Sequence, residues 1–543
     1  MNDKKIAAII HKVDGRIFAE LTKSLKSLTL PEGFTLDIIP AKGTRKFFAY
    51  NEAMEKSDAK YKIYLDENLL MLDKNILVEI IKIFQEDEKI GVIGVSGALE
   101  ISTHGVALNS PKHCGKVFFG RDKAMNDWGG SESGYTEVEA VDDFFLATQY
   151  DITWRHDLFK KNFFCCTAQC LEFRRKGYKS VVVTQDKPWV WNRTEKIPID
   201  ETERAIFLYE YSKDIYPLVS IIIPTFNRPE YFKVALESAL NQTYRNFEIF
   251  ISDNSTNDDT ENLMQDYLKA FKNIKYFHHK DFTASDNWNF AREYNNPDAE
   301  FVNWLLDDDM FYPQKLEIMV EVMRQNPDCS IVASPRHTID AKGNVNGQMP
   351  DYKQYPGLTA PIKLLGEEAG KLIFDGGHNY IGEPTTPLIR KSCLRDNDLC
   401  WTDEEKGFYA LVDISTWCQL LEHGNLYWIG DTVLSAFRRH EGQATNWIGS
   451  GANFEVSWAR LFKIAWEKKV FIKDEKDLRF RILNWLYSAD MRLMQAFQIG
   501  YYDETFTVLE KTMTAMTQAL YNGYEINLPP REYSKNDGIK FLT

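Results

Sequence analysis

The fold is decided by residues 217–268, which read PLVSIIIPTFNRPEYFKVALESALNQTYRNFEIFISDNSTNDDTENLMQDYL. Two short, continuous apolar runs alternate there with two helical patterns, and Phe232, Leu236 and Leu240 recur at helical spacing in the first of these patterns. Continuous apolar runs of this length are typical of parallel strands that helices cover on both faces. The stretch therefore predicts a doubly wound α/β sheet, in which ligands bind at the carboxyl ends of the strands.

Three carboxylates follow the next predicted strand, in residues 301–311, FVNWLLDDDMF. Because adjacent carboxylates repel each other, a fold holds Asp307, Asp308 and Asp309 together mainly where a cation or water neutralises them. Mg²⁺ or Mn²⁺ bound in this way keeps open positions for phosphate groups. An acidic triplet alone is more often a solvated turn, and continued strand geometry would turn Asp308 away from its two neighbours.

Length and composition indicate a multidomain globular protein. The chain has 543 residues, 44% of them hydrophobic and 13% aromatic, which suits about three domains with sizeable cores. The net charge of −14 argues against a nucleic-acid or anionic-membrane surface, since both need a basic footprint. We recognise no signal peptide and no membrane-spanning run, and the eight cysteines lack paired zinc spacing. We therefore expect a cytoplasmic protein with free thiols.

The sequence pattern divides the chain into four parts. Residues 1–195 carry a second α/β pattern, with strands expected near 6–10, 36–39, 62–65 and 93–95, which suggests a duplication of architecture. Residues 196–216 are polar and predict a partly helical connector. Residues 217–450 form the central domain, and residues 451–543 predict helices alone.

The C-terminal helices are expected to be amphipathic. Asp503 is placed to cap the second of two long helices, after Gly500 ends the first. These helices could pack on the central domain, form a dimer interface or cover an acceptor site. One face of the first helix carries Leu478, Ile482, Trp485, Leu486, Ala489, Leu493 and Phe497.

Six features of residues 217–447 resemble, in the right order, a family 2 glycosyltransferase of the nucleotide-diphospho-sugar (GT-A) fold. The features are PTFNRPEY, SDNSTND, LLDDD, IGEPTTPLIRK, VDISTWCQLLEHG and FRRHEGQ. The resemblance implies an inverting enzyme that uses Mn²⁺ or Mg²⁺ and a UDP-sugar donor.

The resemblance also implies which residues bind the donor. Asp253 would hydrogen-bond the base, although an Asx turn with Asn254 and Ser255 also explains it. Asp307 would face the sugar or ribose, and Asp308 is as well explained by a solvated or capping role. Glu383 resembles a residue near the sugar or acceptor, with a turn on Gly382 and Pro384 as the alternative. The nucleotide pocket would be lined by Thr225, Asn227, Arg228 and Glu230.

The metal and the catalytic base follow from the same resemblance. Asp309 and His440 would bind the metal, which neutralises charge on the departing diphosphate. Asp413 would take the proton of the acceptor hydroxyl, and the apolar neighbours Leu411 and Trp417 would raise its proton affinity. Without the resemblance, Asp413 is better explained as the N-cap of a helix over residues 414–422.

Residues 1–195 resemble a divergent glycosyltransferase domain that has lost its working residues. Asp66, Glu67 and Asn68 stand where the metal motif is expected, so the uncharged Asn68 occupies the place of a second acid. Where the catalytic base is expected, the segment begins with Cys166 and contains no carboxylate. We expect this domain to be inactive and to serve in acceptor binding, partner docking or as a scaffold. The alternative is a metal-independent transferase that uses Asp142 or Asp143 as its base.

Together these features predict a transferase that moves a hexose, glucose or galactose, from a UDP-sugar to a hydroxyl of a glycan or glycoprotein. Two alternatives remain open: an enzyme with both domains active, and a non-catalytic glycan-binding or chaperone protein. A homodimer or a partner glycosyltransferase is a further expectation, and nucleic acid is excluded as a partner.

Overall fold

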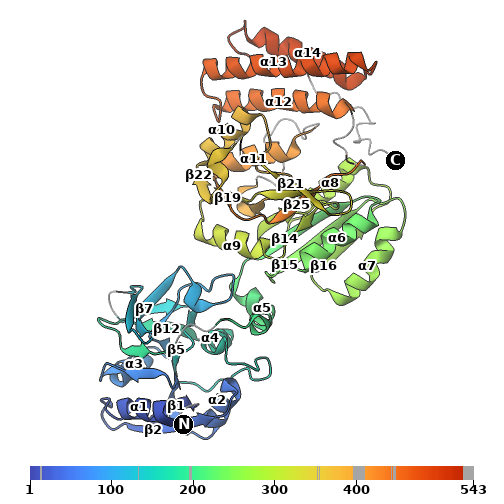
Figure 1. Ribbon diagram of the computed structural model, residues 1–543. Helices are drawn as coiled ribbons and strands as arrows, with labels where there is room; N and C mark the ends of the chain where they lie inside the picture. The colour runs from blue at the N-terminus through green and yellow to red at the C-terminus, as the bar shows by residue number, and fades with distance from the viewer. Residues whose placement is uncertain are drawn as a thin grey trace. The chain divides into compact units, whose positions relative to one another are not determined.

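A computed structural model describes residues 1–12, 15–131, 134–194, 198–350, 353, 355–394, 410–441, 443 and 448–529. The chain divides into two compact units, Met1–Tyr216 and Pro217–Thr543, which are described separately (Figure 1). Both units are α/β structures, as the sequence predicts.

The second unit is built on an eight-stranded sheet in the order β16-β15-β14-β17-β23-β19-β24-β22. Neighbouring strands from β16 to β17 are parallel, and β23 runs antiparallel to both β17 and β19. The strands are β14 (Leu218–Thr225), β15 (Phe247–Asp253), β16 (Ile274–His278), β17 (Ala299–Trp304), β19 (Cys329–Ala333), β22 (Ile362–Leu364), β23 (Leu388–Arg390) and β24 (Asn425–Trp428).

Helices and a smaller sheet accompany this large sheet. The predicted helix after the first strand is α6, and its Phe232 and Leu236 are buried. The helices are α6 (Pro229–Leu240), α7 (Asp259–Ala270), α8 (Ala284–Glu293), α9 (Lys315–Gln325), α10 (Gly366–Gly376) and α11 (Val412–His423). The smaller sheet contains β18 (Met310–Phe311), β20 (Arg336–Ile339), β21 (Val345–Met349) and β25 (Ser435–Arg438).

The first unit has a seven-stranded sheet in the order β2-β1-β3-β11-β5-β12-β9. Its strands are β1 (Asn2–Lys12), β2 (Thr35–Lys42), β3 (Ala59–Asp66), β5 (Ile90–Gly94), β9 (Tyr135–Val138), β11 (Phe145–Thr148) and β12 (Lys179–Val183). A second sheet contains β4 (Leu69–Met71), β6 (Ser96–Ala98), β7 (His113–Phe119), β8 (Ala124–Asp127), β10 (Ala140–Val141) and β13 (Val190–Asn192). The helices are α1 (Gly15–Leu25), α2 (Lys46–Glu55), α3 (Ile76–Glu86), α4 (Cys165–Arg175) and α5 (Glu201–Ile215).

The two large sheets have the same topology. The order β2-β1-β3-β11-β5-β12 in the first unit matches β15-β14-β17-β23-β19-β24 in the second. The pairing directions agree as well, including one antiparallel strand, β11 or β23, between parallel neighbours. The structure therefore contains the duplication of architecture that the sequence suggests.

Helix α5 occupies most of the segment that the sequence marks as a connector. It packs within the first unit, where Phe207 stacks on Phe164 with ring centroids 4.8 Å apart. The Arg175 guanidinium also binds Asp214 at 2.7 Å. Asp200 caps the helix by accepting from the amides of Thr202 and Glu203.

The C-terminal helices are α12 (Ile448–Lys468), α13 (Glu475–Gln498) and α14 (Glu504–Ala519). They share one hydrophobic core with α10, α11 and strands β19 and β24. Figure 1 shows α12 between this part of the α/β structure and the other two helices. Asp503 caps α14 as predicted, accepting from the Thr505 amide. Phe497 does not lie on the buried face with Leu493, because it is largely exposed near the end of α13. None of the helices in the described part of the chain is long and apolar enough to cross a membrane.

Candidate active site

The acidic triplet lies in a turn between two strands. β17 ends at Trp304, β18 begins at Met310, and the Asp309 amide donates to the Leu306 carbonyl at 3.1 Å. Strand alternation therefore does not apply, and the expectation that Asp308 turns away from its neighbours is not met. All three carboxylate side chains are buried.

Asp307 and Asp308 share one guanidinium. Arg228 Nη1 lies 3.6 Å from Asp307 Oδ1 and 3.3 Å from Asp308 Oδ2. The Thr225 hydroxyl donates to Asp307 Oδ2 at 2.9 Å. Burial and the neighbouring charge of Asp308 raise the pKa of Asp307 to about 7. A cation bound at these carboxylates would favour their ionised forms and lower this raised pKa.

The His440 side chain contacts Asp308, whereas the expected metal ligand next to it was Asp309. Its Nε2 lies 3.0 Å from Asp308 Oδ2, and its ring packs on Tyr231 with centroids 5.0 Å apart. Two ligands at right angles on an octahedral Mg²⁺ ion, with bonds of about 2.1 Å, are also separated by about 3 Å. The Asp308–His440 pair therefore fits a divalent cation, in contrast to the expected pairing of Asp309 with His440.

Asp309 is fully buried and both of its oxygens are occupied. Oδ2 accepts from the Thr385 hydroxyl at 2.6 Å, and Oδ1 accepts from the Arg438 amide at 2.9 Å. Burial and the charge of Asp308 raise the pKa of Asp309 well above its usual range. Through these two hydrogen bonds, Asp309 connects the triplet to β25 and to the segment before β23. Both contacts are between residues far apart in the sequence, so the linear sequence could not reveal them.

Most of the residues expected to line the nucleotide pocket lie at the ends of β14 and β15. Asn227 has a positive φ of 51°, its amide donates to the Ser255 hydroxyl at 2.8 Å, and its Oδ1 accepts from the Thr256 amide at 2.9 Å. Asp253 is buried, accepts from the Ser255 amide at 2.7 Å and accepts from the Tyr276 hydroxyl at 2.6 Å. The Asx-turn contact is therefore present at Asp253.

Glu230 is the last of the residues expected to line the nucleotide pocket. It is exposed on the first turn of α6, and within the described residues the structure does not bring it into the carboxylate network.

Asp413 is the second residue of α11 and not its N-cap. The helix begins at Val412 after Leu411, which has a left-handed φ of 60°. Asp413 Oδ1 accepts from the Ile414 amide at 2.8 Å, and Oδ2 accepts from the Asn379 amide group at 2.6 Å. Burial, together with the charge of Glu383, raises the pKa of Asp413 to about 6. This half-buried carboxylate therefore has a proton affinity suited to a general base.

The segment before β23 carries Glu383 and holds Asp413 in place. The buried Arg336 guanidinium binds both oxygens of Glu383, with Nη2 to Oε1 at 3.1 Å. Asn379 links Asp413 to Gly382, because its amide group also donates to the Gly382 carbonyl at 2.8 Å. Sequence reasoning did not find Arg336 or Asn379, since neither lies in a recognisable motif.

Two family models match the chain. One is described as a glycosyltransferase-like family and covers residues 7–211, and the other is described as glycosyl transferase family 2 and covers residues 220–394. Residues 220–394 are therefore a family 2 glycosyltransferase domain.

Several bacterial proteins that are similar in sequence to this glycosyltransferase are themselves named as glycosyltransferases. An uncharacterized glycosyltransferase of Rickettsia typhi is 27% identical over 261 residues, which cover 47% of this chain and 76% of that protein. One from Rickettsia felis is 36% identical, but the match covers only 24% of this chain and 21% of that protein. The GalNAc(5)-diNAcBac-PP-undecaprenol beta-1,3-glucosyltransferase of Campylobacter jejuni is 33% identical over 19% of this chain and 34% of that protein.

Among solved structures, a fragment of S. aureus TarS, residues 1–349, is 14% identical and has a TM-score of 0.35. The match covers 57% of this chain and 89% of that fragment.

In the first unit of the glycosyltransferase, a lysine side chain lies on the acidic residue at the end of β3, the strand that corresponds to β17 before the acidic triplet. The buried Lys46 ammonium lies 3.3 Å from Asp66 Oδ2, and Asp66 Oδ1 accepts from both the backbone amide and the side-chain amide group of Asn68 at 3.1 Å. Burial opposes the charged form of Lys46, but Asp66 holds its pKa well above the usual range. Both oxygens of Asp66 are therefore occupied by protein donors.

The helix that corresponds to α11 in the first unit is α4. It follows Phe164, which has a left-handed φ of 59°, and its second residue is Cys166, the counterpart of Asp413. Asp143 Oδ1 accepts from the Cys166 amide at 2.6 Å. Asp142 is buried between the Ser96 hydroxyl and His113 Nε2. The two carboxylates that the sequence offered as alternative bases thus make structural contacts.

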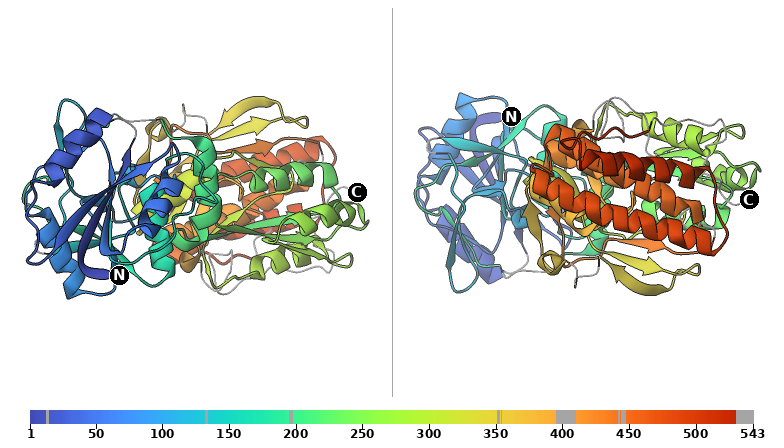
Figure 2. Two further views of the ribbon diagram at one scale, coloured as in Figure 1. Left: turned by 90° about the horizontal axis from the view of Figure 1, so that it is seen from below. Right: turned by 90° about the horizontal axis from the view of Figure 1, so that it is seen from above.

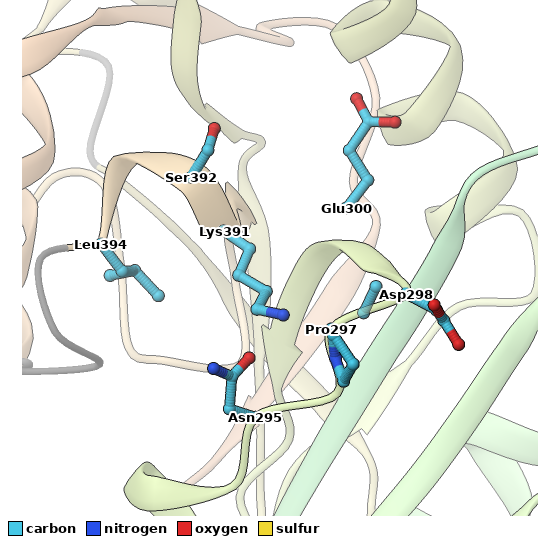
Figure 3. Close-up of a pocket in the computed structure, with 8 residues that line it drawn as sticks. Asn295, Pro297, Asp298, Glu300, Lys391, Ser392 and Leu394 are labelled. Carbon is cyan, nitrogen blue, oxygen red and sulfur yellow. The ribbon is translucent and has the colours of Figure 1, made fainter.

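Two other features of the glycosyltransferase do not coincide with the site. A cavity of about 780 Å³ lies beside Pro297 and Lys391, at the start of β17, whereas the triplet follows the end of that strand (Figure 3). Ligands of such sheets bind at the carboxyl ends of strands, so this cavity is at the wrong end. A group formed by Asp258, Glu261 and His278 could hold a cation, but Asp258 is paired with Lys280 at 2.5 Å.

Proposed function

We propose that this glycosyltransferase is a metal-dependent, inverting enzyme that moves a hexose, glucose or galactose, from a UDP-sugar to a hydroxyl of a glycan or glycoprotein. The proposal depends most on Asp413, a half-buried carboxylate whose pKa is raised by burial and by the charge of Glu383, a residue whose charge also acts on Asp309 of the triplet. The Campylobacter jejuni relative is named as a glucosyltransferase, which supports a hexose donor.

Asp413 acts as the general base in this mechanism. Its Oδ accepts the proton of the acceptor hydroxyl while the hydroxyl oxygen forms a bond to the anomeric carbon. The bond between that carbon and the diphosphate oxygen breaks, and its electron pair leaves with UDP. A single displacement of this kind inverts the anomeric carbon.

The other site residues bind and orient the donor. Asp308 and His440 would hold the Mn²⁺ or Mg²⁺ ion, which supplies Lewis-acid neutralisation of the diphosphate when bound. Asp307 faces the sugar or ribose, and Asp253 accepts from the base. The pocket is lined by Thr225, Asn227 and Arg228, with Glu230 at its edge, and Glu383 lies next to the acceptor. Asp309 keeps a structural role.

We propose further that the first unit is non-catalytic. The contact that supports this is the Lys46 ammonium on Asp66, which, together with the donors of Asn68, occupies both oxygens of that carboxylate. Cys166 also replaces the base. The unit is then free to serve in acceptor binding, partner docking or as a scaffold.

The test is an assay that measures sugar transfer from each of a panel of nucleotide sugars in the presence of Mn²⁺. Hydrolysis of each donor is measured as a second readout. Asp413→Asn and Asp308→Asn should each lower transfer at least 100-fold, whereas the exposed Asp298→Asn serves as a matched control. Full transfer by both site variants would contradict the mechanism. Loss of only one of two linkages in Asp413→Asn would show instead that the first unit is active.

A further inference from the structure

Helix α13 is apolar on two faces, and only one of them is packed. Leu478, Ile482, Trp485 and Ala489 are buried against the other C-terminal helices. A second row, here called the outer stripe, consists of Phe480, Leu483, Tyr487, Met491 and Met494, whose exposed fractions range from 43% to 72%. A helix that is apolar on both faces is ordinarily covered on both.

The outer stripe lies on the outermost helix layer of the second unit. α13 and α14 lie side by side over α12, and this layer is the one nearest the viewer in the right-hand view of Figure 2. The five members of the stripe include no charged residue, and the exposed residues that border it include the neutral Asn484 and Gln495 and the charged Lys476 and Asp490. Aromatic residues and Met are enriched in protein interfaces, whereas Lys and Glu are depleted. The composition therefore matches the centre of an interface.

The residues of the outer stripe have the same spacing whether they are counted from the N-terminal or the C-terminal end of α13. Its five members are separated by three, four, four and three residues, so Tyr487 is the midpoint. An antiparallel copy of α13 would then face Phe480 with the partner's Met494 and Leu483 with the partner's Met491. Tyr487 would face the partner's Tyr487 on the two-fold axis. Such self-complementarity is the requirement of an isologous dimer.

The area of the outer stripe suits a dimer of this kind. At the exposed fractions given above, the five side chains offer on the order of 600 Å² per copy. Complete burial of the stripe on two copies would remove at most about 1,200 Å² from solvent, which is close to the lower limit for a specific, stable interface. Sulfur–aromatic contacts between Phe480 and the partner's Met494 add to the apolar burial. We propose that the outer stripe of α13 is the interface of a homodimer, in which two copies of this chain pair through antiparallel α13 helices.

Sedimentation of the full chain over a range of concentrations tests the proposal. The wild-type protein should sediment at twice 63.1 kDa. Tyr487→Glu places two like charges on the axis, and it should raise the dissociation constant at least 100-fold while leaving circular dichroism and sugar transfer unchanged. The control is Tyr209→Glu on α5, since that side chain is 82% exposed outside the stripe. A monomer at every concentration, or a dimer that survives Tyr487→Glu, would overturn the proposal.

Cross-linking tests the antiparallel direction independently of stability. A short bismaleimide linker should join Leu483→Cys protein to Met491→Cys protein when the two variants are mixed, and it should join neither variant to itself. Wild-type protein under the same conditions reports any background from its own cysteines, most of which are buried. Self-linking of Leu483→Cys would show a parallel pair, and absence of the mixed product would show that another surface forms the contact.

Discussion

At the scale of single residues, the environment of Asp413 decides its chemistry. Burial and the nearby charge of Glu383 favour the protonated acid, while hydrogen bonds from Ile414 and Asn379 favour the carboxylate. The balance gives a pKa of about 6, so the group is ionised at neutral pH and still has a useful affinity for a proton.

The first prediction concerns the pH dependence of transfer. Because only the ionised Asp413 accepts a proton, kcat/KM should rise about tenfold per pH unit below the pKa and level off above about 6. Asp413→Asn should lower kcat by roughly 10²- to 10⁴-fold and abolish this rise of kcat/KM at low pH, here called the acid limb. Steady-state rates from pH 4.5 to 8, in overlapping buffers, provide the measurement. An unchanged acid limb in the variant would assign the titration to another group.

Asn379 gives the second prediction. Its amide group donates to Asp413 Oδ2 at 2.6 Å and so stabilises the ionised carboxylate. A hydrogen bond to a charged group is worth roughly 1.5–3 kcal/mol, so Asn379→Ala should move the acid limb upward by about 1–2 pH units. Transfer should then fall at pH 6 and recover at pH 8. The control is Asn344→Ala, which removes an amide from an exposed turn.

At the scale of elements, backbone geometry places the functional side chains. Leu411 and Phe164 both take a left-handed conformation before α11 and α4, and each helix then presents its second residue at the same position. The sequence predicted the helices but not their first residues, because a left-handed Leu or Phe is not a recognised helix start. This is why Asp413 could be mistaken for an N-cap.

Gly382 gives a prediction at this scale. Its φ of +115° and the Thr386 hydroxyl, 2.6 Å from where a Cβ would lie, both exclude a side chain. Gly377 has a φ of +61° and nothing within 4 Å of that position, so it reports the backbone effect alone. Gly377→Ala should cost roughly 1–2 kcal/mol of unfolding free energy, and Gly382→Ala roughly 1–3 kcal/mol more. Urea denaturation measures the difference, and equal costs would show that the contact with Thr386 relaxes.

At the scale of the whole molecule, the sequence predicted architecture better than contacts. The apolar runs predicted both sheets, since a strand buried on two faces leaves a local signal. The pairing of His440 with Asp308 and the burial of Asp309 could not be predicted, because both depend on a turn and on β25, more than a hundred residues away. The outer stripe of α13 was likewise hidden, since a helix that is apolar on two faces looks like ordinary core.

The duplicated sheets lead to a last prediction, which concerns how many metal ions one chain binds. In the second unit, Asp307 and Asp308 share the guanidinium of Arg228, whereas in the first unit the ammonium of Lys46 pairs with Asp66. Titration calorimetry with Mn²⁺ and UDP should therefore give one ion per chain, not two. Asp308→Asn and His440→Ala should each weaken binding roughly 10- to 100-fold, because each removes one ligand. Asp66→Asn is the matched control in the duplicated sheet, and it should leave affinity and stoichiometry unchanged. A single ion lost in Asp66→Asn would place the metal in the first unit and reverse the roles of the two domains, and two ions of which Asp66→Asn removes one would show a metal site in each unit.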